Sequence, residues 1–94
     1  MDNKLNESLR EVLLITQEEC AEVTQAISKV LRFGTEKRWP EDAPTNREKL
    51  EEEIGDLLAM IDILIERAYL SDSFVNIARK NKKEKLKKWS SIFE

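Results

Sequence analysis

Apolar residues recur alternately four and three positions apart along two long segments of the chain, and this spacing constrains the fold more than any other feature. The first segment runs from Leu9 to Val30 and the second from Leu50 to Ala68. Residues spaced in this way lie on one side of an α-helix, so the pattern predicts two long helices. Only two glycines and two prolines interrupt the chain, and no segment alternates as a β-strand would. The sequence therefore predicts an all-α fold.

Local signals set the expected ends of these helices. A first helix is expected over about residues 5–33, where a glycine follows as a natural stop. Residues 34–46 contain both prolines and are expected to form a loop, and loops of 13 residues are often functional. Thr45 and Glu48 form a capping box, which predicts a second helix over about residues 45–70.

A third, basic helix is expected near the C-terminus. Ser71, Asp72 and Ser73 interrupt the second apolar pattern, and each of them is a suitable helix cap. The helix should continue to about Trp89 through residues 79–88, which carry seven positive charges and one negative charge. The whole chain has a formal net charge of -3, so nucleic acid is not expected as a partner.

The composition also limits the chemistry of the chain. The single cysteine, Cys20, permits no intramolecular disulfide, and its place in the apolar spacing predicts a buried side chain. The absence of histidine excludes a zinc site of the usual Cys/His kind and any histidine base, so a metal would be held by oxygen. Because the N-terminus lacks the layout of a signal peptide and no apolar run is long enough to cross a membrane, we expect a cytoplasmic protein.

A chain of 94 residues is expected to be one domain, residues 1–94, with a small core. Leu58, Met60, Ile63 and Ile65 lie away from the main apolar side of the second helix, so apolar side chains surround most of it. The chain has too few residues to cover them all. We therefore expect a helical bundle of three to four helices per chain, completed by homo-oligomerisation.

Four carboxylates lie beside the apolar sides of the two long helices. Glu19 and Glu22 are three apart in the first helix, and Glu53 and Asp56 are three apart in the second. Residues three apart share a helix face, so packing of the two helices would bring the four acids together. Such a group needs a compensating cation, and Mg²⁺ prefers oxygen ligands. Gly55, between the last two acids, indicates that another helix or a ligand approaches closely. Acid pairs at this spacing also occur on solvated surfaces, so the spacing alone leaves both interpretations open.

The acids belong to longer motifs, which are E-E-x-x-E at Glu18, Glu19 and Glu22, E-x-x-D at Glu53 and Asp56, and K-x-x-R-F-G at residues 29–34. With these motifs, residues 15–66 resemble the MazG-like nucleotide pyrophosphohydrolases, in particular the short single-domain forms found in phages. The resemblance extends more loosely to K-x-x-K-L-x-x-W at residues 82–89.

The resemblance implies an enzyme. Members of this family are all-α oligomers that hydrolyse nucleoside triphosphates to the monophosphate and pyrophosphate with Mg²⁺, for which Mn²⁺ often substitutes. The metal ligands implied by position are Glu19, Glu22, Glu53 and Asp56. Glu18 and Glu19 are the implied catalytic residues, with Glu18 orienting or deprotonating the attacking water. The phage-like motifs favour a dNTP substrate, and imply the host cytoplasm if the protein is phage-encoded.

Five residues are candidates to bind the substrate. Lys82 and Lys85 of the third helix are expected to contact the triphosphate, because a flexible ammonium is a good phosphate partner. Lys29 and Arg32 are weaker candidates for the same contact, and Trp39 of the loop can stack on a base. The alternatives are a solvated third helix for Lys82 and Lys85 and ordinary loop packing for Trp39. For Arg32 the alternative is a pair with an acid.

A non-catalytic function remains open on the sequence alone. A helical interaction module, such as an adaptor or an antitoxin-like protein, would have the same apolar spacing, and its basic third helix would face an acidic partner or nucleic acid. The acids within the long helices favour the enzyme, because an adaptor does not need them. The sequence does not decide between a homodimer and a homotetramer.

Overall fold

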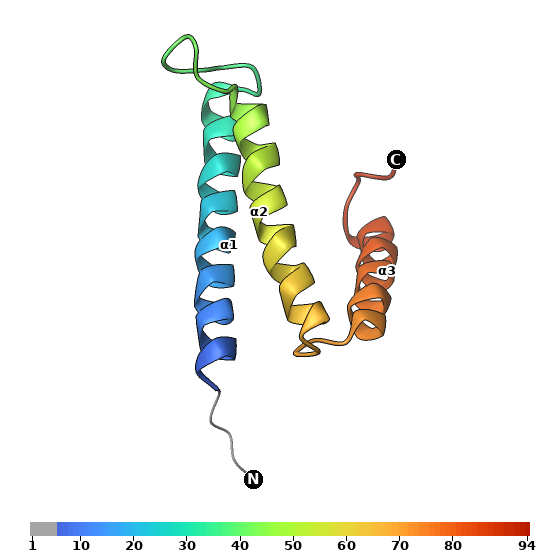
Figure 1. Ribbon diagram of the computed structural model, residues 1–94. Coiled ribbons are helices and arrows are strands. Elements are labelled where there is room, and N and C mark those ends of the chain that lie inside the picture. Colours follow the sequence, from blue (N-terminus) through green and yellow to red (C-terminus); the bar gives the residue numbers. More distant parts are fainter. Residues whose placement is uncertain (1–5) are drawn as a thin grey trace. The chain divides into compact units, whose positions relative to one another are not determined.

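The structure confirms the all-α prediction. The computed structural model describes residues 6–94, which contain three helices and no strand. Helix α1 is Glu7–Phe33, α2 is Asn46–Glu66 and α3 is Asp72–Trp89 (Figure 1). The start expected near Leu5 lies outside the described residues. Within residues 6–94, no helix is both long enough and apolar enough to cross a membrane.

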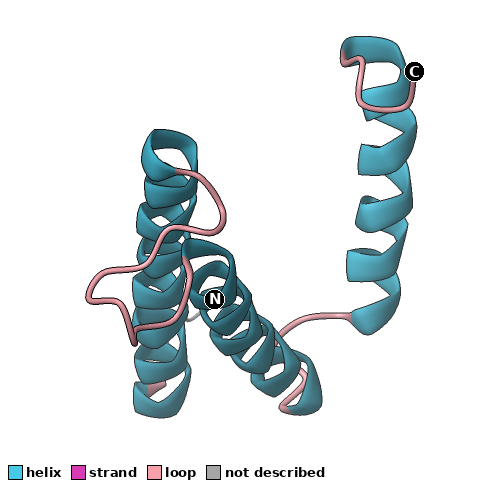
Figure 2. Ribbon diagram, turned by 90° about the horizontal axis from the view of Figure 1, so that it is seen from above, coloured by secondary structure: helices cyan, strands magenta, loops and turns pink. Residues whose placement is uncertain are grey.

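The chain divides into two compact units. The first unit ends at Ile63 and contains α1 and most of α2, which run antiparallel and are joined by the loop at one end (Figure 1). A view from above shows this loop crossing α1 and projecting beyond it before it reaches the start of α2 (Figure 2). The second unit, Leu64–Glu94, contains the last residues of α2, a turn and α3. The assignment of residues 1–94 to one domain stays a prediction.

The helix ends follow the local signals of the sequence. The Asn6 side chain accepts a hydrogen bond of 2.7 Å from the N–H of Leu9 and so caps α1. Gly34 ends α1 with a φ of 89°, a conformation that favours glycine, and its N–H donates to the carbonyl of Val30. Ser71, one of the three expected caps, precedes α3, and its hydroxyl accepts a hydrogen bond from the backbone of the first turn.

The capping box at the start of α2 is present. The N–H of Thr45 donates to Oε1 of Glu48 at 2.9 Å, and the N–H of Glu48 donates to Oγ1 of Thr45 at 3.1 Å. The bond from the Thr45 backbone, followed by that with its hydroxyl, holds the pKa of Glu48 below its ordinary value. Two backbone donors at the helix start are thereby satisfied.

Helix α2 is shorter than expected. It ends at Glu66 rather than near Leu70, because Ala68 adopts a left-handed conformation with a φ of 60°. The N–H groups of Tyr69 and Leu70 then turn back to the carbonyl of Leu64 at 2.9 and 3.2 Å. Glycine is the usual residue at such a helix end, so the sequence carried no signal for it here.

The core of the described chain is small. Its buried apolar side chains are Val12, Ala26 and Leu64. Val12 and Ala26 share one side of α1 with Glu19, seven residues from each. Within the first unit, α1 therefore packs on α2 through the side that carries its carboxylates.

The expectation that Cys20 is buried is wrong. Cys20 is exposed, and Leu13 and Ile27 on the same side of α1 are 40% and 43% exposed. Both sides of α1 are apolar, and the pairing with α2 uses the other one. Helix α2 likewise leaves Ile54 and Leu58 exposed. Apolar side chains of both helices thus stay exposed within the first unit.

Candidate metal centre and loop pocket

Three of the four expected metal ligands converge between the two long helices. Glu19 comes from α1, whereas Glu53 and Asp56 come from α2, and one carboxylate oxygen of each lies within 4.8 Å of the others. Glu53 is only 5% exposed, Glu19 is half-buried and Asp56 is exposed. We call these three residues the acid group.

The packing of α1 on α2 forms the acid group. Glu19 lies on the packing side of α1, between Val12 and Ala26, and therefore faces α2. Glu53 and Asp56 share a face of α2 because they are three residues apart. Hydrophobic burial of the flanking residues thus holds like charges together at the helix interface.

The other two predicted acids lie outside the acid group. Glu22, one turn further along α1 than Glu19, is exposed, and among the described residues its carboxylate is not one of those whose oxygens meet within 4.8 Å. Glu18 is also exposed and precedes Glu19 directly. The structure therefore brings together three of the five acids in the two motifs.

The acid group carries excess negative charge. The pKa of Glu19 is raised, first by partial burial and then by the charges of Asp56, Glu53, Glu22 and Glu18. A carboxylate that is harder to ionise than usual, in a field of other acids, indicates that a cation would be favourable here.

Lys49 supplies part of the missing positive charge. Its Nζ lies 3.2 Å from Oε1 of Glu53 and 3.5 Å from Oε1 of Glu52. The hydrogen bond to Glu53, followed by the charge of Glu52, raises the pKa of the Lys49 ammonium. Sequence reasoning missed this residue, although its position four residues before Glu53 was a usable signal.

The donor set of the acid group fits a divalent cation. Its three members offer carboxylate oxygens, which are the ligands that Mg²⁺ and Mn²⁺ prefer. Glu53 is the most enclosed of them, so its charge gains most from a direct partner. A monovalent ammonium on one edge leaves Glu19 and Asp56 uncompensated.

Gly55 does not mark a close approach within the described chain. A Cβ atom built at this position would have no neighbouring atom within 4 Å. No other helix of the described chain therefore passes close to Gly55, and the approach of a ligand stays a prediction. An alanine at this position fits the space around it.

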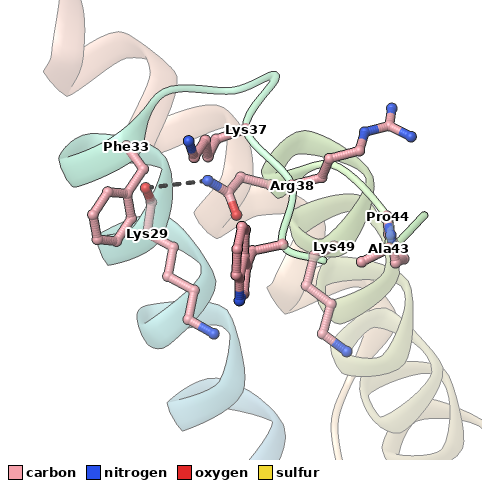
Figure 3. A pocket seen from close by; sticks show the side chains of 9 residues that line it. Lys29, Phe33, Lys37, Arg38, Ala43, Pro44 and Lys49 are labelled. Atoms are coloured by element: carbon pink, nitrogen blue, oxygen red, sulfur yellow. Dashed lines mark hydrogen bonds between the residues drawn. The ribbon is translucent and has the colours of Figure 1, made fainter. Parts of the chain in front are cut away.

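An open pocket of about 600 Å³ lies at the loop end of the two helices (Figure 3). The residues that line it are Lys29, Phe33, Lys37, Arg38, Trp39, Ala43, Pro44, Asn46 and Lys49. Four of these side chains are cationic, two are aromatic and none is acidic. This volume lies in the range of small-molecule sites, and the charge favours an anion. We call it the loop pocket.

Asn46 fixes the walls of the loop pocket. Its side-chain Nδ2 donates to the carbonyl of Gly34 at 3.0 Å and to that of Lys29 at 3.5 Å, the second bond being drawn in Figure 3. Its backbone N–H donates to the carbonyl of Lys37 at 2.8 Å. One residue therefore ties the end of α1 and the loop to the start of α2.

The predicted substrate-binding residues are divided between several places. Lys29 and Trp39 line the loop pocket, with Trp39 highly exposed. Arg32 does not line it, and its guanidinium lies 4.9 Å from the centroid of the adjacent Phe33 ring. Lys82 and Lys85 are exposed residues of α3, in the second unit, so their contribution to a site stays a prediction. Sequence reasoning missed the cations Lys37 and Arg38, which have no recognisable motif.

The fold and the acid group define an all-α protein with a candidate divalent-metal centre between antiparallel helices. The family model of the MazG nucleotide pyrophosphohydrolase domain matches residues 7–87, which cover nearly all of the three helices. The chain therefore belongs to this family, and it is a hydrolase. This assignment confirms the resemblance seen in the motifs and decides for the enzyme over the non-catalytic alternative. No curated protein and no solved structure matches the chain significantly.

Proposed function

We propose that the chain is a Mg²⁺-dependent pyrophosphohydrolase that cleaves nucleoside triphosphates, dNTPs among them, between the α and β phosphates. The observation that carries this proposal is the convergence of Glu19, Glu53 and Asp56 within 4.8 Å in a chain of this family. The products are the nucleoside monophosphate and pyrophosphate. We place the reaction in the cytoplasm, that of the host if the protein is phage-encoded.

The three members of the acid group are the proposed metal ligands. Glu22, one turn further along α1, is the fourth candidate. The cation, when bound, neutralises charge on the phosphates and makes the phosphorus more electrophilic. Mn²⁺ should substitute for Mg²⁺, because it accepts the same oxygen donors.

Glu18 and Glu19 are the proposed catalytic carboxylates. In the reaction, a water oxygen bonds to the α-phosphorus, the bond from that phosphorus to the α–β bridging oxygen breaks, and pyrophosphate leaves with this oxygen. One proton of the water must be accepted, and carboxylates are suitable bases in a chain without histidine. Glu18 is exposed beside Glu19, and we assign it to orient the water and take its proton.

The loop pocket is the proposed site for the rest of the nucleotide. Lys29 and Lys49 extend from facing helices in the same direction, and both line the pocket (Figure 3). We assign Lys29 to the phosphate chain and Trp39 to stacking on the base, because an exposed ring stacks on any base. Arg32, Lys82 and Lys85 are further candidates for phosphate contacts.

We propose that the enzyme acts as a homo-oligomer, either a dimer or a tetramer. The exposed apolar residues Leu13, Ile27, Ile54 and Leu58 lie on the two helices that form the acid group. A second copy that covers them would supply the core that 94 residues lack. Sedimentation velocity gives the mass directly, and a species of 11.0 kDa at micromolar concentration would contradict this assembly.

Pyrophosphate release tests the reaction. The eight common NTPs and dNTPs are each incubated with Mg²⁺ and with EDTA, and both products are quantified. We expect equal amounts of pyrophosphate and monophosphate, only with the metal. Release of orthophosphate and diphosphate would mean that the other phosphoanhydride bond is cut.

Matched variants locate the activity. Glu53→Gln keeps the shape of the most enclosed member of the acid group and removes its charge, so activity should be lost. Asp62→Asn removes an exposed acid from the same helix, and this variant should keep its activity. Equal activity of the two variants would contradict the assignment of the acid group.

A further inference from the structure

The ion pair between Lys49 and Glu53 joins the acid group to the loop pocket. The Glu53 side chain is 7% exposed, whereas that of Lys49 is 46% exposed, and their charged atoms are 3.2 Å apart. Lys49 is also one of the residues that line the loop pocket. One flexible ammonium thus touches the most enclosed acid from the pocket side.

Helix preferences do not explain why a lysine occupies position 49. It lies at the end of the first turn of α2, where the helix dipole disfavours a positive charge. In its pair with Glu53 the lysine precedes the acid by four residues, which is the weaker order for such pairs. The enclosed carboxylate therefore accounts for the position of the ammonium better than the helix does.

The loop pocket offers the same ammonium a second kind of partner. Lys29, Lys37 and Arg38 line it with Lys49, and none of its lining residues is acidic. Arg38 has a nearby acid, Glu48, at 3.9 Å, but the pocket as a whole carries a surplus of positive charge. An anion such as a phosphate would therefore be attracted to the place where the Lys49 stem already lies.

We propose that Lys49 exchanges partners during substrate binding: its ammonium pairs with Glu53 in the ligand-free protein, and turns to a phosphate in the loop pocket when a divalent cation occupies the acid group. This inference rests on the proposed function. Cation and ammonium carry the same sign and compete for one carboxylate, so binding of the first releases the second. The four-carbon stem of lysine permits the movement without a change in the backbone.

The exchange couples two sites. A cation that releases Lys49 raises the affinity of the loop pocket for phosphate, and a phosphate that holds Lys49 raises the affinity of the acid group for the cation by the same factor. Lys49 is accordingly a substrate-binding residue that also compensates the charge of Glu53 when no metal is present.

The first test is Mn²⁺ affinity without nucleotide, measured by isothermal titration calorimetry. Lys49→Gln should bind Mn²⁺ more tightly than the wild type, by about two- to fivefold, because the competing ammonium is gone. Lys49→Arg keeps the charge and should restore the wild-type value. Lys87→Gln breaks a lysine pair of 3.0 Å with Glu84 on α3 and should leave the affinity unchanged. Equal or weaker Mn²⁺ binding by a folded Lys49→Gln, as judged by circular dichroism, would overturn the exchange.

The second test uses the α,β-imido analogue of dATP, which cannot be cleaved at the proposed bond. Its binding is measured at saturating Mn²⁺. Lys49→Gln should bind it about tenfold more weakly, since a charge-assisted hydrogen bond is lost. Unchanged binding would overturn the exchange even if pyrophosphate release by the wild type is normal. Conversely, the expected Mn²⁺ and analogue results, with no pyrophosphate release by the wild type, would uphold the exchange and refute the proposed reaction.

Discussion

Replacing Asp56 by asparagine should make the metal-free protein more stable. One oxygen of Asp56 lies within 4.8 Å of one oxygen of Glu19 and of one oxygen of Glu53, and Coulomb's law in water gives about 0.9 kcal/mol for each of these two pairs of like charges. The dielectric constant of water is appropriate because Asp56 is exposed. Asparagine keeps nearly the same shape and helix propensity, so the free energy of unfolding should rise by about 1.7 kcal/mol at low salt, and by less as salt is added.

Magnesium should reverse this order. A cation that binds only the folded state stabilises it by about 2.7 kcal/mol at a hundred times its Kd, which is more than the substitution contributes. The wild type should therefore gain stability on addition of Mg²⁺, whereas Asp56→Asn, with one ligand fewer, should gain much less. Urea unfolding of both proteins, in EDTA and in Mg²⁺, measures all four values.

Asp62→Asn is the matched control for this experiment. It removes an exposed acid from α2 away from the acid group, so its stability should stay within about 0.5 kcal/mol of the wild type in both conditions. The reasoning is refuted if Asp56→Asn is no more stable than the wild type in EDTA. It is refuted equally if Mg²⁺ stabilises the variant as much as the wild type.

Other expectations concern the helix ends and exposed positions. Gly55→Ala should raise the free energy of unfolding by about 1 kcal/mol, because nothing lies near the new methyl group. If urea unfolding gives a lower free energy for the variant instead, a second chain packs against this position. Thr45→Ala should lower it by about 1 kcal/mol through loss of the cap. Since the pKa of Glu48 is lowered on folding, its stabilisation is present above the ordinary value of 4.5 and is lost as the pH falls through the folded value. In Glu48→Gln the free energy of unfolding should therefore fall less steeply than in the wild type as the pH is lowered. Cys20 lies on the same side of α1 as Leu13 and Ile27, so a thiol reagent should modify it fully without denaturant at protein concentrations low enough to give a monomer, and should modify it more slowly when a second copy covers this side. Full reaction of an assembled oligomer would contradict the proposed interface.

The sequence was a good guide wherever the signal was local. Caps and stops act within one helical turn, and so Gly34, Thr45 with Glu48, and Ser71 marked helix ends that the structure confirms. The end of α2 was missed because Ala68 takes the left-handed conformation that a glycine usually marks.

The side of α1 that packs on α2 was not predictable from spacing. Val12 and Leu13 belong to adjacent apolar sides of one helix, and hydrophobicity alone does not choose between them. The choice depends on the partner helix, and therefore on contacts between residues far apart in the sequence. For the same reason the acids could be paired correctly across the helices while the packing side of α1 was predicted wrongly.

The loop pocket was the least predictable part of the candidate site. Its walls are joined by bonds from Asn46 to Gly34 and Lys29, which are 12 and 17 residues away. No sequence motif predicts contacts between residues so far apart in the chain. By contrast, Lys49 could have been found, since its spacing from Glu53 places both on one face of a helix.

The enclosure of Glu53 affects how the sequence can change over generations. Position 53 is as enclosed as Val12 and Ala26, yet it carries a carboxylate where an apolar side chain would pack well. A single substitution to such a residue would strengthen the helix pair and at the same time remove one of three converging acids. Selection for stability alone would therefore erase the acid group, and its survival in a lineage requires a benefit that folding does not provide.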